Sequence, residues 1–184
     1  MGPPGAGKGT QAVVVAARLG VPHISTGDIF RANVRDLTAL GRKAKEYLDA
    51  GEYVPDDVTN AMVRDRLGQP DCASGFLLDG YPRTLDQVAE LDAILSALGT
   101  QVDRVVEMVV SREEVAQRLA QRAAEQGRSD DTAEVINRRL DVYNEQTQPL
   151  LRSYQDRGLL VAVDGLGSVE EVTARIVSAL GLSA

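Results

Sequence analysis

A glycine-rich segment at the start of the chain has the residue types and spacing of a phosphate-binding loop. Residues 2–10 read GPPGAGKGT, a variant of the G-x-x-x-x-G-K-[S/T] pattern with one extra glycine before the threonine. The glycines let backbone N–H groups converge on an anion, and the helix that follows offers its positive N-terminal end. Lys8 can then reach the β- and γ-phosphates of a nucleotide, and Thr10 can lie near Mg²⁺. A Gly/Pro turn before a helix would not require three spaced glycines together with a lysine.

Two arginines and one aspartate occupy places where a phosphate site would use them. Arg31 lies near the start of a predicted helix, where its guanidinium can bind a phosphate through two parallel hydrogen bonds. Arg83 follows a buried strand that ends at Asp79, and ligands of parallel sheets bind at that carboxyl edge. An unpaired carboxylate there would be costly, so a Mg²⁺-bound water or a nearby lysine is its natural partner. Taken singly, each arginine also fits a solvated surface charge.

Four more arginines come late in the chain, around a short glycine-containing loop. Arg118 and Arg122 lie four residues apart on one face of a predicted helix. Arg128 and Arg139 flank the start of the next helix. The four guanidiniums can therefore converge on a cleft between the two helices. The alternative is a lattice of salt bridges with the acidic residues Glu114, Glu125 and Asp130.

Short apolar runs and longer helical stretches alternate between residue 10 and the end of the chain. The runs are rich in leucine and β-branched residues and lack strict alternation, as in strands that are buried on both faces. This pattern predicts an α/β fold in which helices cover both faces of a parallel sheet. The predicted strands are residues 21–25, 75–79, 104–110 and 159–164. The predicted helices are residues 10–19, 27–34, 38–50, 56–67, 85–98, 112–125, 132–156 and 169–180.

Three helix starts carry the signature of a capping box, a Ser or Thr followed three residues later by Glu or Gln. The pairs are Thr84/Gln87, Ser111/Glu114 and Ser168/Glu171. In such a box the two side chains exchange hydrogen bonds with each other's backbone N–H groups. We therefore expect helices to begin at these three places.

Composition limits the classes of protein that need to be considered. The chain has 184 residues, 43% of them hydrophobic, which suits one domain over residues 1–184. Its formal net charge of -7 argues against a basic nucleic-acid-binding face or a polybasic membrane patch. One cysteine and one histidine leave no cluster for a structural zinc ion and no internal disulfide, which fits a reducing cytoplasm. We find neither a membrane span nor a signal peptide, so no membrane partner is expected.

A phosphate-binding loop normally follows a buried central strand, yet only Met1 precedes Gly2. Losing such a strand would remove several buried apolar side chains and most of the stability of an ordinary domain. We therefore expect the native chain to start upstream of Met1.

Several separated motifs together resemble those of adenylate kinase, the nucleoside monophosphate kinase that interconverts ATP plus AMP with two ADP. They are the loop over residues 5–10, STGDIFR over 25–31, DAGEYVP over 49–55, and DGYPR over 79–83 with Gln87. The resemblance covers nearly the whole chain. It implies a P-loop kinase fold whose parallel sheet has five strands, four of them encoded here. It also implies an AMP-binding insertion over residues 25–54 and a short lid over residues 122–131.

The resemblance assigns roles on the ATP side and at the point of transfer. It implies that ATP is bound by Gly5, Ala6, Gly7, Lys8, Gly9, Thr10, Arg118 and Gly167. Where relatives often have lysine this chain has Gly167, so only a main-chain contact is implied at that position. It implies that phosphoryl transfer is promoted by Lys8, Arg83, Arg122, Arg128 and Arg139.

The resemblance also assigns the AMP site. The implied residues are Thr26, Arg31, Glu52, Tyr53, Val54, Gly80, Tyr81, Pro82, Arg83, Gln87, Arg128 and Arg139. Gln87 has two competing uses, because it ends the capping box that begins at Thr84 and because the family uses a glutamine here to read adenine. The related UMP/CMP kinases usually carry asparagine at this place, so Gln87 favours AMP.

The metal and the lid follow from the same resemblance. Mg²⁺ is expected to accompany ATP, held largely through water by Thr10 and Asp79. Residues 123–127 form a short loop where many relatives insert a longer lid, some with four zinc-binding cysteines, so the short, zinc-free type is expected. Even a short lid must close over the phosphates to exclude water.

These observations predict an adenylate kinase that acts as a cytoplasmic monomer on ATP, AMP and ADP. Phosphoryl transfer between two polyanions needs concentrated positive charge and the exclusion of water more than it needs a base. Two alternatives stay open at this stage. One is a UMP/CMP kinase, and the other is a truncated module that binds nucleotides without turning them over.

Overall fold

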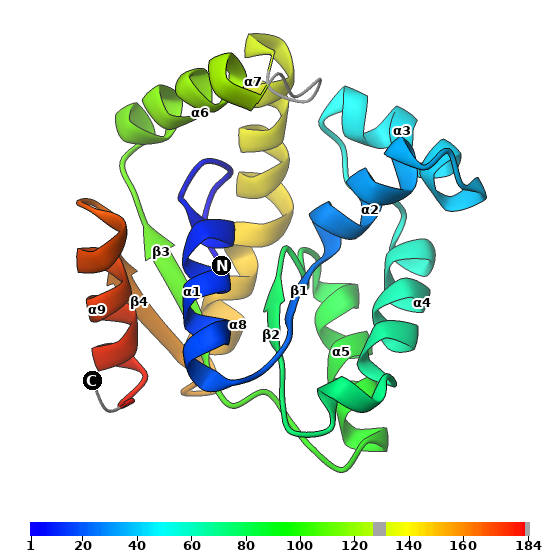
Figure 1. Ribbon diagram of the computed structural model, residues 1–184, viewed down its shortest axis with the longest axis vertical. Coiled ribbons are helices and arrows are strands. Elements are labelled where there is room, and N and C mark those ends of the chain that lie inside the picture. The colour runs from blue at the N-terminus through cyan, green and yellow to red at the C-terminus, as the bar shows by residue number, and fades with distance from the viewer. Residues whose placement is uncertain (127–131, 183–184) are drawn as a thin grey trace.

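The computed structural model describes residues 1–126 and 132–182, and it shows parallel strands flanked by helices (Figure 1). Strand β1 (His23–Ser25) pairs with β2 (Leu77–Asp79), and β3 (Val105–Val109) pairs with β4 (Leu160–Asp164), both in parallel. All four predicted strands are therefore present, each ending within one residue of its predicted end. In the described part of the chain they form two separate two-stranded sheets rather than the one expected sheet.

The residue before the glycine-rich loop lies on the inner edge of β3. The Met1 amine donates a hydrogen bond to the Val106 carbonyl, and the Met108 N–H donates to the Met1 carbonyl at 2.9 Å. These two bonds have the pattern of parallel strand pairing opposite Glu107. The loop therefore starts between the two strand pairs, as the position of the amino end in Figure 1 shows.

Helices cover both sides of the strands. Their bounds are α1 (Lys8–Leu19), α2 (Thr26–Arg35), α3 (Ala39–Ala50), α4 (Asp56–Leu67), α5 (Leu85–Ala97), α6 (Arg112–Gln126), α7 (Ala133–Val142), α8 (Gln148–Asp156) and α9 (Val169–Ala179). A short 3₁₀ turn, η1 (Pro70–Cys72), precedes β2, and a π-helical turn, η3 (Tyr143–Thr147), joins α7 to α8. Helices α2 and α3 form a hairpin within residues 25–54, the segment expected to bind AMP. None of the helices among these residues is both long enough and apolar enough to cross a membrane.

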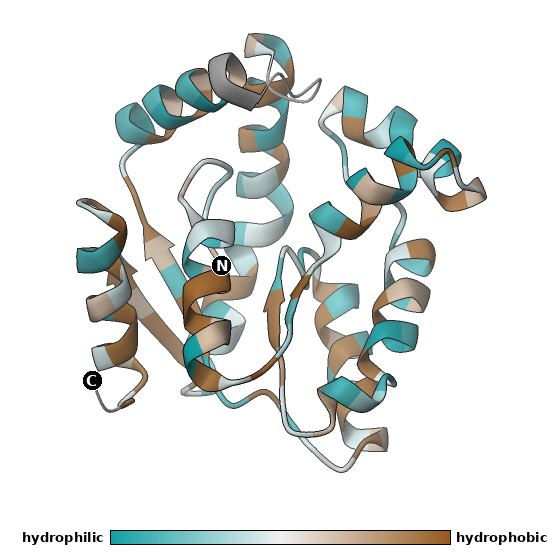
Figure 2. Ribbon diagram, in the orientation of Figure 1, coloured by the Kyte–Doolittle hydropathy of each residue, from teal (hydrophilic) through white to brown (hydrophobic). Residues whose placement is uncertain are grey.

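The core holds the loop and the strand ends in place from two sides. On one side Val15 of α1 and Ile176 of α9 pack with Ala6 of the loop and Met108 of β3. On the other side Ile24 of β1 packs with residues of α4 and α5, namely Val63, Leu67, Leu91, Ile94 and Leu95. Figure 2 shows the hydrophobic residues gathered on the strands and on the helix faces turned toward them. Because β1 leads directly into the first residue of α2, Thr26, and β2 leads into the loop that carries Arg83, this packing fixes where those residues lie.

The predicted capping boxes are present only in part. Ser168 and Glu171 form a complete box at the start of α9. At α5 the Thr84 hydroxyl accepts from the Gln87 N–H, but the Gln87 side chain does not return to the Thr84 backbone. At α6 Ser111 Oγ accepts from the Glu114 N–H, while the Glu114 carboxylate pairs with Arg118. The expectation of three full boxes was therefore wrong for two helices, because a nearby partner takes the side chain that would close the box.

The helix expected over residues 132–156 is interrupted. It consists of α7, the π-helical turn η3, and α8, which has a proline among its first residues. Pro149 lacks the N–H that a regular helix would direct to the carbonyl of residue 145, and its ring clashes with that carbonyl. A wider turn relieves both problems. Periodicity predicted the helix correctly but not this local widening.

Gly41 is required where α3 crosses α2. A Cβ atom added at residue 41 would lie 2.0 Å from the Asn33 carbonyl oxygen, so the two backbones approach too closely for any side chain. We expect Gly41→Ala to lower the free energy of unfolding by about 3 kcal/mol, because the hairpin must separate to accept a methyl group. Urea unfolding followed by circular dichroism measures this change.

Gly68→Ala is the matched control for Gly41→Ala. Residue 68 has an ordinary helical backbone with φ −75°, and a Cβ atom there would meet neighbours only at 3.5 Å and beyond. We expect its effect to stay within about 0.5 kcal/mol. Equal stability of the two variants would contradict the close approach of α2 and α3.

Candidate active site

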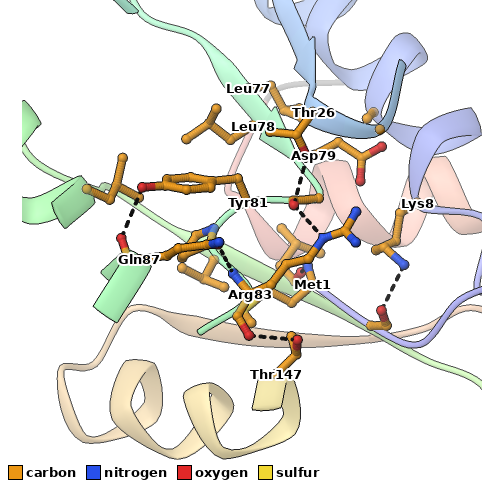
Figure 3. A pocket seen from close by; sticks show the side chains of 18 of the residues that line it. Met1, Lys8, Thr26, Leu77, Leu78, Asp79, Tyr81, Arg83, Gln87 and Thr147 are labelled. Atoms are coloured by element: carbon orange, nitrogen blue, oxygen red, sulfur yellow. Dashed lines mark hydrogen bonds between the residues drawn. The ribbon is translucent and has the colours of Figure 1, made fainter. Parts of the chain in front are cut away.

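The glycine-rich loop leads directly into the first turn of α1. Gly7 caps this helix with a left-handed backbone (φ +89°), a conformation that favours glycine. Lys8 is the first helical residue, and its side chain folds back over the loop, so that Nζ donates to the carbonyls of Gly2 and Pro3, each at 2.8 Å. Figure 3 draws one of these two hydrogen bonds. The ammonium therefore lies over the loop, beside the helix end that attracts anions.

Lys8 lies at the centre of a cluster of positive charge. Burial lowers the pKa of its ammonium from the usual 10.5 to about 8, and the carboxylate of Asp79 opposes that shift. The charges of Arg83, Arg139 and Arg122 lower this pKa further. Three arginines, from the loop after β2, from α6 and from α7, therefore lie close enough to act on the Lys8 ammonium of α1. Such a cluster is costly unless an anion joins it, which makes it a suitable place for phosphates.

Asp79 lies at the carboxyl end of β2, facing the glycine-rich loop. A Cβ atom at Gly9 would be 3.5 Å from its Oδ2, and His23 Nε2 lies 3.7 Å from that same oxygen. Burial by itself raises the pKa of Asp79, but the contact with His23 and the charge of Lys8 outweigh burial and hold the pKa below its usual value. Asp79 is therefore an ionised carboxylate next to the loop.

Arg83 is fixed by contacts along its whole length. Its Nε donates to the Gly80 carbonyl at 2.6 Å, and the Thr26 hydroxyl donates to the same oxygen at 2.9 Å. Its guanidinium carbon lies 4.9 Å from the centre of the Tyr53 ring, within the range of a cation–π contact. Thr147 Oγ1 donates to the Arg83 carbonyl at 2.9 Å (Figure 3). It also bonds the Tyr53 hydroxyl at 2.8 Å. The arginine is therefore pre-oriented before any anion binds.

Gln87 forms a wall of the same region and is almost completely buried, at 2% exposure. Its Oε1 accepts from the Arg83 backbone N–H at 2.7 Å, and its Nε2 donates to Asp56 Oδ1 at 2.6 Å. The Tyr81 hydroxyl donates to Asn60 Oδ1 and to the Gln87 carbonyl, which holds this stretch of backbone from the other side. The Gln87 side chain thus binds to neighbours outside its own helix cap.

One cavity of about 600 Å³ brings most of the predicted site residues together. The predicted residues on its wall are Lys8, Thr26, Arg31, Glu52, Tyr53, Val54, Asp79, Gly80, Tyr81, Pro82, Arg83, Gln87 and Arg139. Of these, Arg31 pairs with Asp28 at 2.5 Å, and Glu52 pairs with Arg138 of α7 at 2.6 Å. The residues predicted to bind AMP that the structure describes therefore share one cavity with Lys8.

Other predicted residues lie away from the cavity wall. Arg118 crosses behind the loop, where its guanidinium donates to the carbonyls of Ala6, at 3.3 Å, and Gly165, at 2.9 Å. It therefore links the loop to the segment that contains Gly167, whose backbone has φ +109°. Thr10 is exposed on the first turn of α1. Arg128, Asp130 and the second half of the predicted lid over residues 122–131 lie outside the described residues.

Sequence reasoning missed three residues that support the site: His23 beside Asp79, Asp56 beside Gln87, and Thr147 beside Arg83. Each contact joins residues between 31 and 64 positions apart, so no local spacing indicates it. The one local signal was Pro149, which disturbs the helix just after Thr147. Within the described ranges, no group of three or more His, Cys, Asp or Glu side chains is placed to hold a metal ion.

Comparison with known proteins agrees with this arrangement. The family model described as adenylate kinase matches residues 1–159. The chain is 61% identical to the adenylate kinase of Kocuria rhizophila over 98% of its own length and 96% of that protein. It is 59% identical to the adenylate kinase of a Nocardioides species and 57% identical to that of Thermobifida fusca, over 98% of its length and 94% and 95% of those proteins.

Proposed function

Because the chain belongs to the adenylate kinase family, we propose that its cavity is where ATP and AMP meet end to end, with Lys8 between them. The reaction of the family is the reversible transfer of a phosphoryl group from ATP to AMP, and the chain is accordingly a nucleoside monophosphate kinase. The observation that carries the placement is the cluster of Lys8, Arg83 and Arg139 on the wall of one cavity. The charges of Arg83, Arg139 and Arg122 also lower the pKa of Lys8. This cluster lies where the glycine-rich loop meets the cavity that holds the AMP-site residues.

The chain's own residues promote transfer by holding charge in place. The phosphate of AMP is already anionic at neutral pH, so the nucleophile needs no general base. Lys8 and the arginines stabilise the negative charge that spreads over the transferred group. Lys8 and Arg83 are already held in place by neighbouring carbonyls before binding, so little reorganisation is needed. Arg83, pre-oriented by Gly80 and Tyr53, holds the acceptor phosphate in line with the loop.

The two nucleotides occupy different parts of the site. ATP phosphates bind the backbone N–H groups of the loop and the start of α1, and its adenine lies toward Arg118 and the segment around Gly167. AMP binds between the α2–α3 hairpin and the loop after β2, and Gln87 reads its base. Both subsites come from one chain, which supports action as a monomer. A cytoplasmic location and the absence of nucleic-acid and membrane partners stay predictions.

The residues next to the loop fit a magnesium ion that arrives with ATP. Asp79 is held ionised at the carboxyl end of β2, and Thr10 adds a hydroxyl on the first turn of α1. Mg²⁺ prefers hard oxygen donors and keeps several waters, so one carboxylate and one hydroxyl are enough beside the phosphates. When bound, the ion neutralises charge on the phosphate oxygens of ATP.

An acceptor panel tests the proposed function directly. With Mg²⁺ and ATP held constant, ADP production is measured with AMP, UMP, CMP or no acceptor. We expect turnover with AMP to exceed turnover with either pyrimidine nucleotide by at least about a hundredfold. The rate without acceptor should be a small side reaction, and chelating Mg²⁺ with EDTA should abolish all turnover.

The same panel separates the two alternatives. A preference for UMP or CMP would identify a pyrimidine nucleotide kinase and contradict the reading of adenine by Gln87. ATP binding by calorimetry without turnover of any acceptor would indicate a nucleotide-binding module. A rate without acceptor that rivals the rate with AMP would contradict the exclusion of water from the closed site.

A further inference from the structure

The amide of Gln87 is held in one orientation by two partners of opposite character. The Arg83 backbone N–H can only donate, and it faces Oε1 at 2.7 Å. The carboxylate of Asp56 can only accept, and its Oδ1 faces Nε2 at 2.6 Å. A reversed amide would place two donors against each other and two acceptors against each other. Both contacts would then be lost inside a site where the glutamine is 2% exposed.

Asp56 is itself fixed in position. It is the first residue of α4, and its second carboxylate oxygen, Oδ2, accepts from the Thr84 hydroxyl at 2.7 Å. That hydroxyl in turn accepts from the Gln87 N–H at 3.1 Å. Asp56, Thr84 and Gln87 thus form a closed ring of hydrogen bonds between α4 and α5. Asp56 is not among the residues that line the cavity, so it lies behind Gln87 rather than against a ligand.

We propose that Asp56 is a positioning residue that makes the acceptor site select adenine over 6-oxopurines. With one N–H and one lone pair used by Asp56 and Arg83, the amide keeps one N–H on Nε2 and one lone pair on Oε1 for a base. Adenine offers the complement, an acceptor at N1 beside a donor at N6. Hypoxanthine and guanine offer the reverse, a donor at N1 beside an acceptor at O6, and they would need the reversed amide. This inference rests on the proposed reading of the base by Gln87.

Inosine monophosphate is the sharpest probe, because it differs from AMP only at the edge that the amide reads. The value of kcat/KM for AMP and for IMP is measured with wild type, Asp56→Asn and Asp57→Asn. The amide that the first variant introduces at position 56 can either donate or accept, so it no longer opposes a reversed Gln87. We expect the AMP-to-IMP ratio to fall about tenfold in Asp56→Asn, mainly through KM. The Arg83 N–H still donates to Gln87 Oε1 and favours the original orientation of the amide, so it limits the fall in the AMP-to-IMP ratio.

Asp57→Asn is the matched control. Asp57 is the next residue of the same helix turn and is exposed, so its replacement removes the same charge from the same helix end without touching Gln87. We expect its ratio to stay within about twofold of wild type. Asp56→Ser is the second variant should Asp56→Asn fail to fold. The serine hydroxyl can also donate or accept a hydrogen bond.

A further variant, Gln87→Leu, separates failure of the inference from failure of the proposed function. No turnover of AMP by wild type would overturn both. If Gln87→Leu leaves the AMP-to-IMP ratio unchanged, the base is read elsewhere and the inference falls with the proposed AMP site. If Gln87→Leu changes the ratio but Asp56→Asn and Asp56→Ser do not, the inference alone is overturned. A lowered ratio in both Asp56 variants with an unchanged ratio in Asp57→Asn supports it.

Discussion

Replacing Lys8 with methionine is expected to lower kcat about a thousandfold, which corresponds to roughly 4 kcal/mol of transition-state stabilisation. Methionine keeps most of the length of the side chain and removes the charge. The ammonium lies over the loop carbonyls, at the point where the charges of Arg83, Arg122 and Arg139 act together. Negative charge on the transferred group is greatest in the transition state, so KM for each nucleotide should change much less than kcat.

Lys43→Met is the control for Lys8→Met. Lys43 is exposed on α3, away from the loop, and its replacement should leave kcat within about twofold of wild type. Lys8→Arg keeps the charge but not its compact shape, so we expect an intermediate rate. Lys8→Met turning over at a rate close to wild type would contradict the central role of Lys8 and with it the placement of the phosphates.

The parts of the fold that depend on local pattern were predictable from the sequence. Buried strands, helix periodicity and the ends of β1 and β2 follow from side-chain types along a short window. The separation of the strands into two pairs does not follow from such a local pattern, because it depends on which backbone edges meet. Nor does the π-helical turn, where the effect of Pro149 is spread over the preceding residues.

In the candidate site, too, some residues could be predicted from local pattern and others could not. The residues that we propose to contact phosphates lie in short motifs with fixed spacing, so the loop, Arg31 and Arg83 could be picked out before the fold was known. Residues that orient them act through contacts that the fold creates. Thr147 reaches Arg83 across 64 positions, and Asp56 reaches Gln87 across 31. Neither residue type is unusual in its own segment, so no local pattern marks it.

Replacing Arg83 with methionine is expected to lower kcat/KM for AMP about a thousandfold while KM for ATP stays close to wild type. The guanidinium is anchored by the Gly80 carbonyl and by the Tyr53 ring. Its loss removes the charge that, in the proposed function, holds the acceptor phosphate in line with the ATP end of the site. Steady-state kinetics with each nucleotide varied in turn measures both effects.

Two further variants show whether geometry matters as well as charge at this position. Arg83→Lys keeps the charge but cannot form two parallel hydrogen bonds, so we expect a loss of about a hundredfold in kcat/KM for AMP. Arg35→Met removes an arginine whose side chain is 75% exposed at the end of α2, and it should stay within about twofold of wild type. If Arg83→Met lowered kcat/KM for AMP no more than Arg35→Met, the acceptor phosphate would have to bind elsewhere.

The Arg83 backbone also bonds Gln87 and Thr147, and neither bond involves the replaced side chain. The amide of Gln87 should therefore keep its orientation in both Arg83 variants. Their preference for AMP over IMP should therefore survive the loss of rate.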